Sequence, residues 1–334
     1  MRRRDSQIRF RQDPAAPAGR KGAAAGRRLS FGETAIDSLN VLITGATGLI
    51  GGALRERLES RRHRVFALDR SDAGAAFRYS AERREIRLDP AIELDAVVNL
   101  AGANISASRW SEDYKRLIMD SRVKLTRALA AVLAASAHKP RVFLSATAIG
   151  FYGDTGAETA DESSPRGADF LAEVAGAWEA ACEPALAAGI RTVNMRFGVV
   201  LSRDGGVLKE MSLPFKLGGG GKLGDGSQYM SWIALSDVIS LIELCLRDET
   251  ISGPINFVSG RPATNAEFTR ALGKVLRRPA FSPFLRAWLI RLLFGEMGEA
   301  LLLGSNRVVS RRYEEIGFTP AYSDLTEALI AELR

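Results

Sequence analysis

The stretch VLITGATGLIG, residues 41–51, decides the fold. Its first three residues are large and apolar, which is typical of a short strand buried on both faces of a parallel sheet. Apolar side chains then recur at helical spacing from about residue 49 to residue 58, so we expect a helix directly after the strand. A strand, a glycine turn and a helix in this order predict the first unit of an α/β sheet that is covered by helices.

Three glycines lie in this turn, spaced as G-x-x-G-x-x-G. We expect Gly45 to allow the sharp turn, Gly48 to let the backbone approach a pyrophosphate, and Gly51 to let helix and strand pack closely. The free N–H groups and the positive end of the helix would then face the phosphates. The cofactor contacts predicted in this loop are Gly45, Thr47, Gly48, Leu49, Ile50 and Gly51.

The residues that distinguish NAD from NADP follow a second apolar strand over residues 64–68. Asp69 ends that strand and is placed to accept both hydroxyls of an adenosine ribose, which favours NAD. Arg70 comes next and offers a partner for a 2′-phosphate, which favours NADP. The residues themselves predict a nicotinamide dinucleotide and leave both forms open.

Length and charge limit the classes of partner. With 334 residues, the chain is long enough for a large α/β domain and a smaller lobe. Residues 1–30 hold eight Arg and one Lys against Asp5 and Asp13, which equals the whole net charge of +7. The rest of the chain is neutral overall, so no nucleic-acid partner is expected. Residues 1–38 are predicted to be a disordered tail; a solvated extension, an upstream start and an organelle transit peptide remain open readings.

Scarce cysteine and histidine exclude several chemistries. Two cysteines in apolar surroundings indicate neither disulfides nor a metal site and favour a reducing, cytoplasmic location. The two histidines flank a strand and a helix, away from any expected site, which argues against triad hydrolysis and zinc chemistry. The apolar stretch 284–303 is broken by four charged residues, so we expect a core or interface helix pair and no membrane contact.

Strands and helices alternate through the first two thirds of the chain, with further strands expected at 85–89, 95–102, 141–145 and 190–196. This order predicts a Rossmann-type doubly wound parallel sheet, with a smaller C-terminal α/β substrate lobe. Ligands of such sheets bind beyond the carboxyl ends of the strands. The cofactor contacts predicted at further strand ends are Asp89, Leu100, Ala101, Gly102 and Arg196. We assign 39–200 to the cofactor domain and 201–334 to the substrate lobe, with a return to the sheet around 231–258.

Several motifs in register point to a known family. TGATGLIG (44–51) and NLAG (99–102) resemble the extended short-chain dehydrogenase/reductase, or NAD-dependent epimerase/dehydratase, superfamily. SATAIGFYG (145–153), RFGVVL (196–201) and GDGSQYMSWI (224–233) resemble its SDR39U1-type epimerase-like subfamily, often labelled as cell-division inhibitors. The resemblance covers about residues 40–334 and includes the subfamily's extra C-terminal domain. It implies NADP in preference to NAD, because the subfamily carries an arginine at the place of Arg70.

The chain departs from the superfamily at the catalytic pair. Its enzymes usually hold a Tyr-x-x-x-Lys pair, but Phe170 and Val174 stand where the pair would fall. The third catalytic member, a Ser or Thr after the fifth strand, remains available as Ser145 or Thr147. Tyr152 is the nearest phenol, and without a lysine beside it we expect its pKa to stay near the ordinary value of about 10.

Two hypotheses follow. The first is an epimerase or oxidoreductase that acts on a small polar substrate; this substrate would be anionic or nucleotide-linked if the following basic side chains converge on the cleft: Arg109, Lys115, Arg196, Lys216 and Lys222. The second is a catalytically degenerate NADP(H)-binding protein that acts in regulation or protein interaction. Both a monomer and a homodimer remain open.

Overall fold

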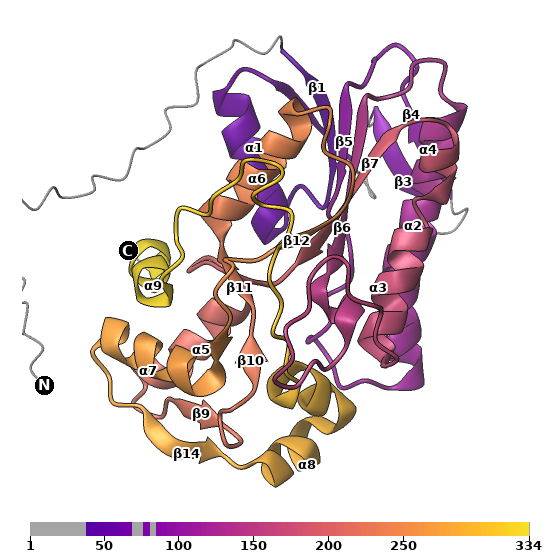
Figure 1. The fold of residues 1–334 in the computed structure, drawn as a ribbon. Helices are drawn as coiled ribbons and strands as arrows, with labels where there is room; N and C mark the ends of the chain where they lie inside the picture. Colours follow the sequence, from indigo (N-terminus) through magenta and orange to yellow (C-terminus); the bar gives the residue numbers. More distant parts are fainter. Residues whose placement is uncertain (1–37, 69–75, 81–84, 334) are drawn as a thin grey trace, which may run out of the picture. The chain divides into compact units, whose positions relative to one another are not determined.

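The computed structural model describes residues 38–68, 76–80 and 85–333. In these residues a central sheet has the strand order β12-β7-β6-β5-β1-β2, with every neighbouring pair parallel (Figure 1). Its strands are β1 (Asn40–Thr44), β2 (Arg64–Ala67), β5 (Ala96–Asn99), β6 (Val142–Ala148), β7 (Arg191–Phe197) and β12 (Gly253–Phe257). The predicted parallel α/β sheet is confirmed.

The apolar run in β1 is explained by burial on both faces of the sheet. Val41 and Ile43 pack into one core, together with α1 (Leu49–Ser60) and α6 (Leu235–Arg247). Leu42 packs into the other core, against α2 (Glu112–Ala135). All three side chains are fully buried. Each contributes about 1.5–3 kcal/mol by leaving water, so the sequence shows no polar alternation here.

Helices cover both faces of the sheet. Figure 1 shows α1 and α6 on one side, and α2, α3 (Phe170–Ala180) and α4 (Glu183–Ala187) on the other. The segment between β6 and β7 forms two helices on this side, α3 and α4, instead of one long helix. Pro184 lies in the first turn of α4, where its missing N–H costs no hydrogen bond, so it starts the second helix.

The strand expected at residues 85–89 does not join the central sheet. It is β4 (Glu85–Leu88), which pairs with β3 (Phe77–Ser80) as an antiparallel hairpin. The hairpin packs on the face that α2 covers, where the Phe77 ring lies 5.2 Å from the Phe66 ring. A parallel neighbour of β5 would need a crossover of about a dozen residues or more, and only residues 89–95 connect β4 to β5.

After β7 the chain builds a second lobe and returns to the sheet once, as β12. The lobe's core includes Phe215, Trp232 and Phe268, all fully buried or nearly so. Short strand pairs brace it: β8 with β11, β10 with β13, and β9 with β14. The remaining elements are η1 (Ile149–Tyr152), β8 (Val199–Leu201), α5 (Gly206–Lys216), β9 (Gly221–Leu223), β10 (Tyr229–Met230), β11 (Trp232–Ala234), β13 (Ala263–Thr264), α7 (Asn265–Leu276), β14 (Phe281–Leu285), α8 (Ala287–Gly298), η2 (Glu299–Leu303) and α9 (Leu325–Leu333).

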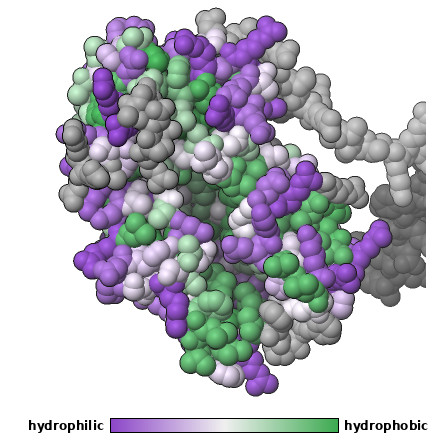
Figure 2. All heavy atoms as spheres, turned by 180° about the vertical axis from the view of Figure 1, so that it is seen from behind, coloured by the Kyte–Doolittle hydropathy of each residue, from purple (hydrophilic) through white to green (hydrophobic). Residues whose placement is uncertain are grey.

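The apolar stretch at 284–303 forms β14, α8 and η2. Gly295 has a φ of +59° and interrupts α8, and η2 is one turn of π-helix. Trp288 and Leu292 of α8 are 60% and 65% exposed. Figure 2, which shows the molecule from behind, has apolar surface gathered at its lower end. Across the described ranges, the helices are all too short or too polar to cross a membrane.

Candidate functional site

The glycine loop joins β1 to α1 at the carboxyl edge of the sheet. Gly45 has a φ of +69°, and a Cβ there would lie 3.1 Å from the main chain of Leu100 and Ala101. A Cβ on Gly51 would lie 2.2 Å from the carbonyl oxygen of Gly45, closer than any real side chain comes. Both glycines are therefore required for the loop to pack against α1 and against the segment after β5.

The middle of the loop is open to a ligand. Thr47 and Gly48 are exposed, and Gly48 precedes α1 without a side chain that caps the helix. The first turn, with Leu49 and Ile50, contains no acidic residue. Its N–H groups and the positive helix end thus suit a phosphate, and the absent Cβ at Gly48 leaves the approach clear. The chain's own residues fit the pyrophosphate of a dinucleotide here.

Three other predicted cofactor residues, Asp69, Arg70 and Asp89, have different outcomes. Asp69 and Arg70 lie outside the described residues. Asp89 lies at the wrong edge of the sheet, in a cavity of about 830 Å³ that His138 and Pro140 also line. Pro140 comes just before β6, at the amino edge, whereas the glycine loop follows β1 at the carboxyl edge. Because β4 turns away into the hairpin, Asp89 and this larger cavity are separated from the glycine loop.

A buried hydrogen-bond network holds the carboxyl ends of β1, β5 and β6 together. Thr44 Oγ1 donates to Asn99 Oδ1 (2.7 Å), and Asn99 Nδ2 donates to Thr126 Oγ1 (2.8 Å) and Ser145 Oγ (3.2 Å). The Ala101 N–H donates to Thr44 Oγ1 (3.1 Å), which positions the chain after β5 beside the glycine loop. Ser145 is fully buried in this network. Its hydroxyl braces the strand ends and does not face an open site.

Three more predicted residues meet in a second network, which the sequence did not reveal. Arg196 donates through Nε and Nη2 to the two carboxylate oxygens of Glu179, at 2.7 and 2.8 Å. Its Nη1 donates to the Tyr152 hydroxyl (2.8 Å), which in turn donates to Asn256 Oδ1 (2.8 Å). Thr147 Oγ1 donates to Glu179 Oε1 (3.2 Å).

Charge and burial shift the pKa values of Arg196 and Tyr152. Burial alone would lower the pKa of the Arg196 guanidinium, but the hydrogen bonds and charge of Glu179 outweigh it and raise the pKa. Burial raises the pKa of the Tyr152 phenol, and Arg196 offsets only part of that effect. The expectation of an ordinary Tyr152 pKa is therefore wrong, and this phenol stays protonated at neutral pH. Arg196 is 3% exposed, and its guanidinium lies 3.6 Å from the centroid of the Phe151 ring, so it has little surface to offer a cofactor.

Glu179 and Asn256 are the polar partners that sequence reasoning missed. A charged side chain near the end of a buried strand is a signal that a counter-charge must be close, because an unpaired buried charge is costly. That signal was present at Arg196. It does not identify the partner, since Glu179 lies on α3 and Asn256 on β12.

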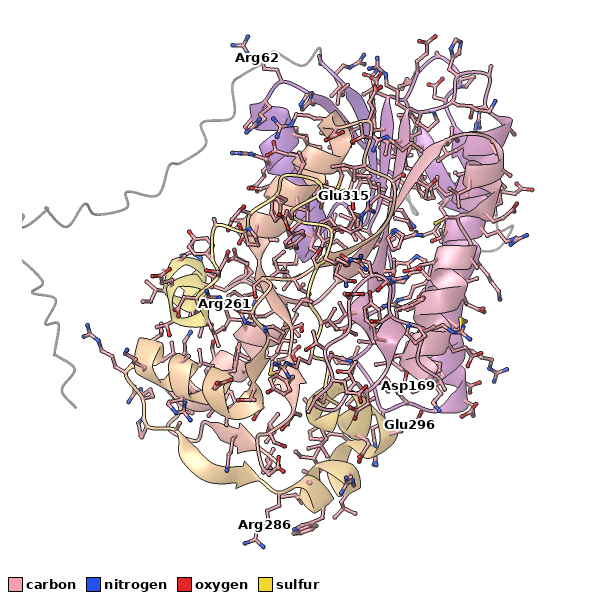
Figure 3. All side chains as sticks on the ribbon, viewed as in Figure 1. Arg62, Asp169, Arg261, Arg286, Glu296 and Glu315 are labelled. Carbon is pink, nitrogen blue, oxygen red and sulfur yellow. The ribbon has the colours of Figure 1, made fainter. Side chains whose placement is uncertain are left out.

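A pocket of about 270 Å³ lies at the carboxyl edge, between the loop after β6, the start of α3, and the α8–η2 segment. The Trp110 and Phe170 rings, 5.1 Å apart and edge-on, form one wall. Figure 3 shows Asp169, the residue before α3, and Glu296 of α8 on the same side of the molecule. The carboxylates that line this acidic pocket are Asp154, Asp169, Glu296 and Glu299.

The basic side chains expected to converge on the cleft are largely paired within the protein. Lys115 Nζ lies 2.5 Å from Glu296 Oε2, and its pKa is raised chiefly by that hydrogen bond. Arg109 Nη2 donates to the carbonyl of Leu292 (3.3 Å), and Arg196 pairs with Glu179. Lys216 and Lys222 lie on α5 and β9 and do not line the acidic pocket. The side chains that line the pocket therefore carry net negative charge.

Comparison with known proteins gives the family of this chain. A model of the NAD dependent epimerase/dehydratase family matches residues 41–258, and a model of a domain of unknown function, DUF1731, matches residues 287–332. An epimerase family protein of Mycobacterium leprae is 36% identical over 291 residues, which cover 86% of this chain and 94% of that protein. Epimerase family protein SDR39U1 of Mus musculus is 35% identical over 295 residues, 87% of this chain and 98% of that protein.

Among solved structures, human epimerase family protein SDR39U1 with NADPH superimposes with a TM-score of 0.78. It is 32% identical in sequence, and the match covers 88% of this chain and 99% of that one. The motifs that pointed to this superfamily and to its SDR39U1-type members are therefore confirmed over most of the chain.

Proposed function

We propose, because the chain belongs to the NAD dependent epimerase/dehydratase family, that it binds NADP(H) at the glycine loop and acts with it on a small polar substrate in the acidic pocket. The observation that carries the proposal is the open, uncapped start of α1 between Gly45 and Gly51, where an added Cβ would crowd the main chain. NADP(H) is favoured over NAD(H) by Arg70 and by the NADPH in the human relative's structure.

The charge of the acidic pocket favours one class of substrate. Two of its four carboxylates are paired within the protein, Glu296 with Lys115 and Glu299 with Arg291. The other two, Asp154 and Asp169, can accept hydrogen bonds from hydroxyl or ammonium groups and repel phosphates and carboxylates. The Trp110 and Phe170 rings offer apolar surface to one side of a ring or short chain. A substrate that is uncharged and rich in hydroxyls, or cationic, therefore suits the pocket better than the anionic substrate that the sequence suggested.

When bound, the nicotinamide supplies or accepts a hydride, so the protein must move a proton at the substrate oxygen or nitrogen. Phe170 and Val174 stand in place of the usual Tyr–Lys pair, and the Tyr152 hydroxyl is occupied by Arg196 and Asn256. Among the pocket's groups, the exposed Asp154 and Asp169 carboxylates are the acid–base candidates. Each already accepts one backbone N–H, which orients it and leaves oxygen lone pairs for a substrate.

A second candidate function is cofactor binding without turnover, in a regulatory or interaction role. Its support is the burial of every hydroxyl proposed for catalysis: Ser145, Thr147 and Tyr152 are at most 6% exposed and hydrogen-bonded within the protein. Such a protein would bind NADPH and respond to it by a change of conformation or partner.

The two candidates are separated by one pair of measurements. Calorimetric titration with NADPH and NADH tests the cofactor site, and absorbance of the reduced nicotinamide then follows oxidation with carbonyl compounds that are uncharged, cationic or anionic. Turnover with uncharged or cationic carbonyls supports the first candidate. Tight NADPH binding without oxidation by any class supports the second, and turnover restricted to anionic carbonyls contradicts the assignment of the substrate class.

We also propose that residues 39–200 bind the cofactor and that residues 201–334 complete the substrate pocket through the α8–η2 segment, while Asp154, Asp169 and the Trp110 and Phe170 rings of the first range form its other side. We further propose that the protein is a cytoplasmic monomer or homodimer. The two buried, unpaired cysteines support a reducing compartment. Light scattering on the purified chain separates monomer from dimer.

A further inference from the structure

Arg122 on α2 is a partly buried cation that supports the segment after β5. Its Nη2 donates to the carbonyl of Ala103 (2.9 Å), and its Nη1 donates to the carbonyl of Ile118 (3.0 Å). The guanidinium carbon lies 5.1 Å from the centroid of the Trp178 ring, a distance typical of a cation–π contact. The side chain is therefore held on three sides.

Two adjacent residues of α2 clamp both polar groups of one peptide residue. Ser121 Oγ accepts the N–H of Ala103 (3.1 Å), while Arg122 donates to the carbonyl of the same residue. A Cβ on Gly102 would lie 3.2 Å from the Arg122 guanidinium carbon. The chain at Gly102–Ala103 thus rests directly on the guanidinium, with no side chain between them.

In the part of the chain that the structure describes, this positive charge has no carboxylate partner. Among the described residues, none forms an ion pair with Arg122, in contrast to the pairs Arg196–Glu179 and Lys115–Glu296. The one electrostatic contribution that favours the charged form of Arg122 comes from the Tyr114 side chain. Burial lowers the pKa of the Arg122 guanidinium to about 10, so it remains a cation at neutral pH.

The strand order indicates which part of the cofactor lies over this cation. The adenosine end of a dinucleotide lies beyond β2, and its pyrophosphate lies at the glycine loop after β1. The sheet continues from β1 to β5 and β6, so the nicotinamide half extends over β5 and β6. Gly102 and Ala103 follow β5 and form the surface on that side.

We propose that Arg122 is a positioning residue that fixes the floor under the nicotinamide half, and that its charge makes the site prefer the reduced cofactor. The inference rests on the proposed function, because it assumes a nicotinamide dinucleotide at the glycine loop. The oxidised ring carries a positive charge and the reduced ring is neutral. An uncompensated guanidinium beneath the ring therefore repels only the oxidised form.

The test compares Kd for NADPH and for NADP⁺ by calorimetry in the wild-type chain and three variants. Arg122→Gln removes the charge and keeps a donor for the Ala103 carbonyl, whereas Arg122→Lys keeps the charge. Arg127→Gln, at an exposed position on the same helix, is the matched control. We expect the ratio of Kd for NADP⁺ to Kd for NADPH to fall about tenfold or more in Arg122→Gln, because only the oxidised ring carries a charge that the lost guanidinium repelled.

The ratio should stay within about twofold of wild type in Arg122→Lys and Arg127→Gln, against the tenfold change expected for lost charge. Equal weakening of both cofactors by Arg122→Gln and Arg122→Lys, with an unchanged ratio, would mean a purely structural clamp and overturn the inference alone. If Arg122→Gln does not fold, the wild-type ratio decides: equal affinity for the two forms overturns the inference. Wild-type chain that binds neither form overturns the proposed function and this inference with it.

Discussion

Replacing Glu179 with alanine should destabilise the fold strongly, because Arg196 would remain charged and buried. Arg196 is 3% exposed and makes two charge-assisted hydrogen bonds to Glu179, at 2.7 and 2.8 Å. After the change, its remaining described hydrogen-bond partner is the Tyr152 hydroxyl. Removing one member of a buried ion pair costs about 3–5 kcal/mol. The Glu179 side chain is 14% exposed, so some water reaches the new cavity, and we expect about 3 kcal/mol, at the lower end of that range.

Urea unfolding followed by circular dichroism measures this loss, provided the denaturant slope is unchanged. Glu59→Ala is the control: its partner Arg55 lies at a similar distance of 2.8 Å, but the two side chains are 44% and 50% exposed. An exposed pair of this kind contributes at most about 1 kcal/mol. Joint replacement by Glu179→Leu and Arg196→Met should recover most of the stability, since apolar residues of similar size leave no charge unpaired.

A loss of less than about 1 kcal/mol in the free energy of unfolding of Glu179→Ala would refute the reasoning, because a buried unpaired guanidinium destabilises a fold by more than that. Arg196 would then have another counter-ion or reach water. It would become available again as a cofactor contact.

Four further predictions address the cofactor, the phenol and the tail. Gly48→Val should abolish NADP(H) binding in calorimetry while circular dichroism shows an intact fold, because its Cβ would come no closer than 3.3 Å to other protein atoms yet fills the phosphate approach. Tyr152→Phe should cost about 1–3 kcal/mol in urea unfolding, for the lost hydroxyl bridge between Arg196 and Asn256. Because its pKa is raised, the Tyr152 phenol gives its full contribution below the unfolded pKa of about 10 and loses it only at higher pH, so this cost should not change across the neutral range. Arg70→Ala should weaken NADPH about tenfold or more and leave NADH nearly unchanged, the loss of a charge-assisted phosphate contact; equal weakening of both would make Arg70 structural. A chain that starts at Asp37 should keep its melting temperature and cofactor affinity, and a drop of many degrees would show that the tail is docked.

The sequence alone determined the fold class and the glycine loop, because both depend on local physics. Three consecutive buried positions require apolar side chains, as at 41–43. The turn requires a positive φ at Gly45 and no Cβ at Gly51, which lies against the main chain of Gly45 and Ala46. Such requirements act within a few residues of each other and leave a direct trace in the amino-acid order.

Tertiary structure decided which polar residues face the site. Ser145 and Thr147 both lie within β6, which runs past the strand predicted at 141–145, and hydrogen bonds to Asn99 and Glu179, from distant segments, hold both hydroxyls away from the open cleft. The acidic pocket is a second case: Lys115 on α2 is neutralised by Glu296 on α8. Charge in a folded site is a sum over neighbours in space, and the order of residues along the chain does not specify those neighbours.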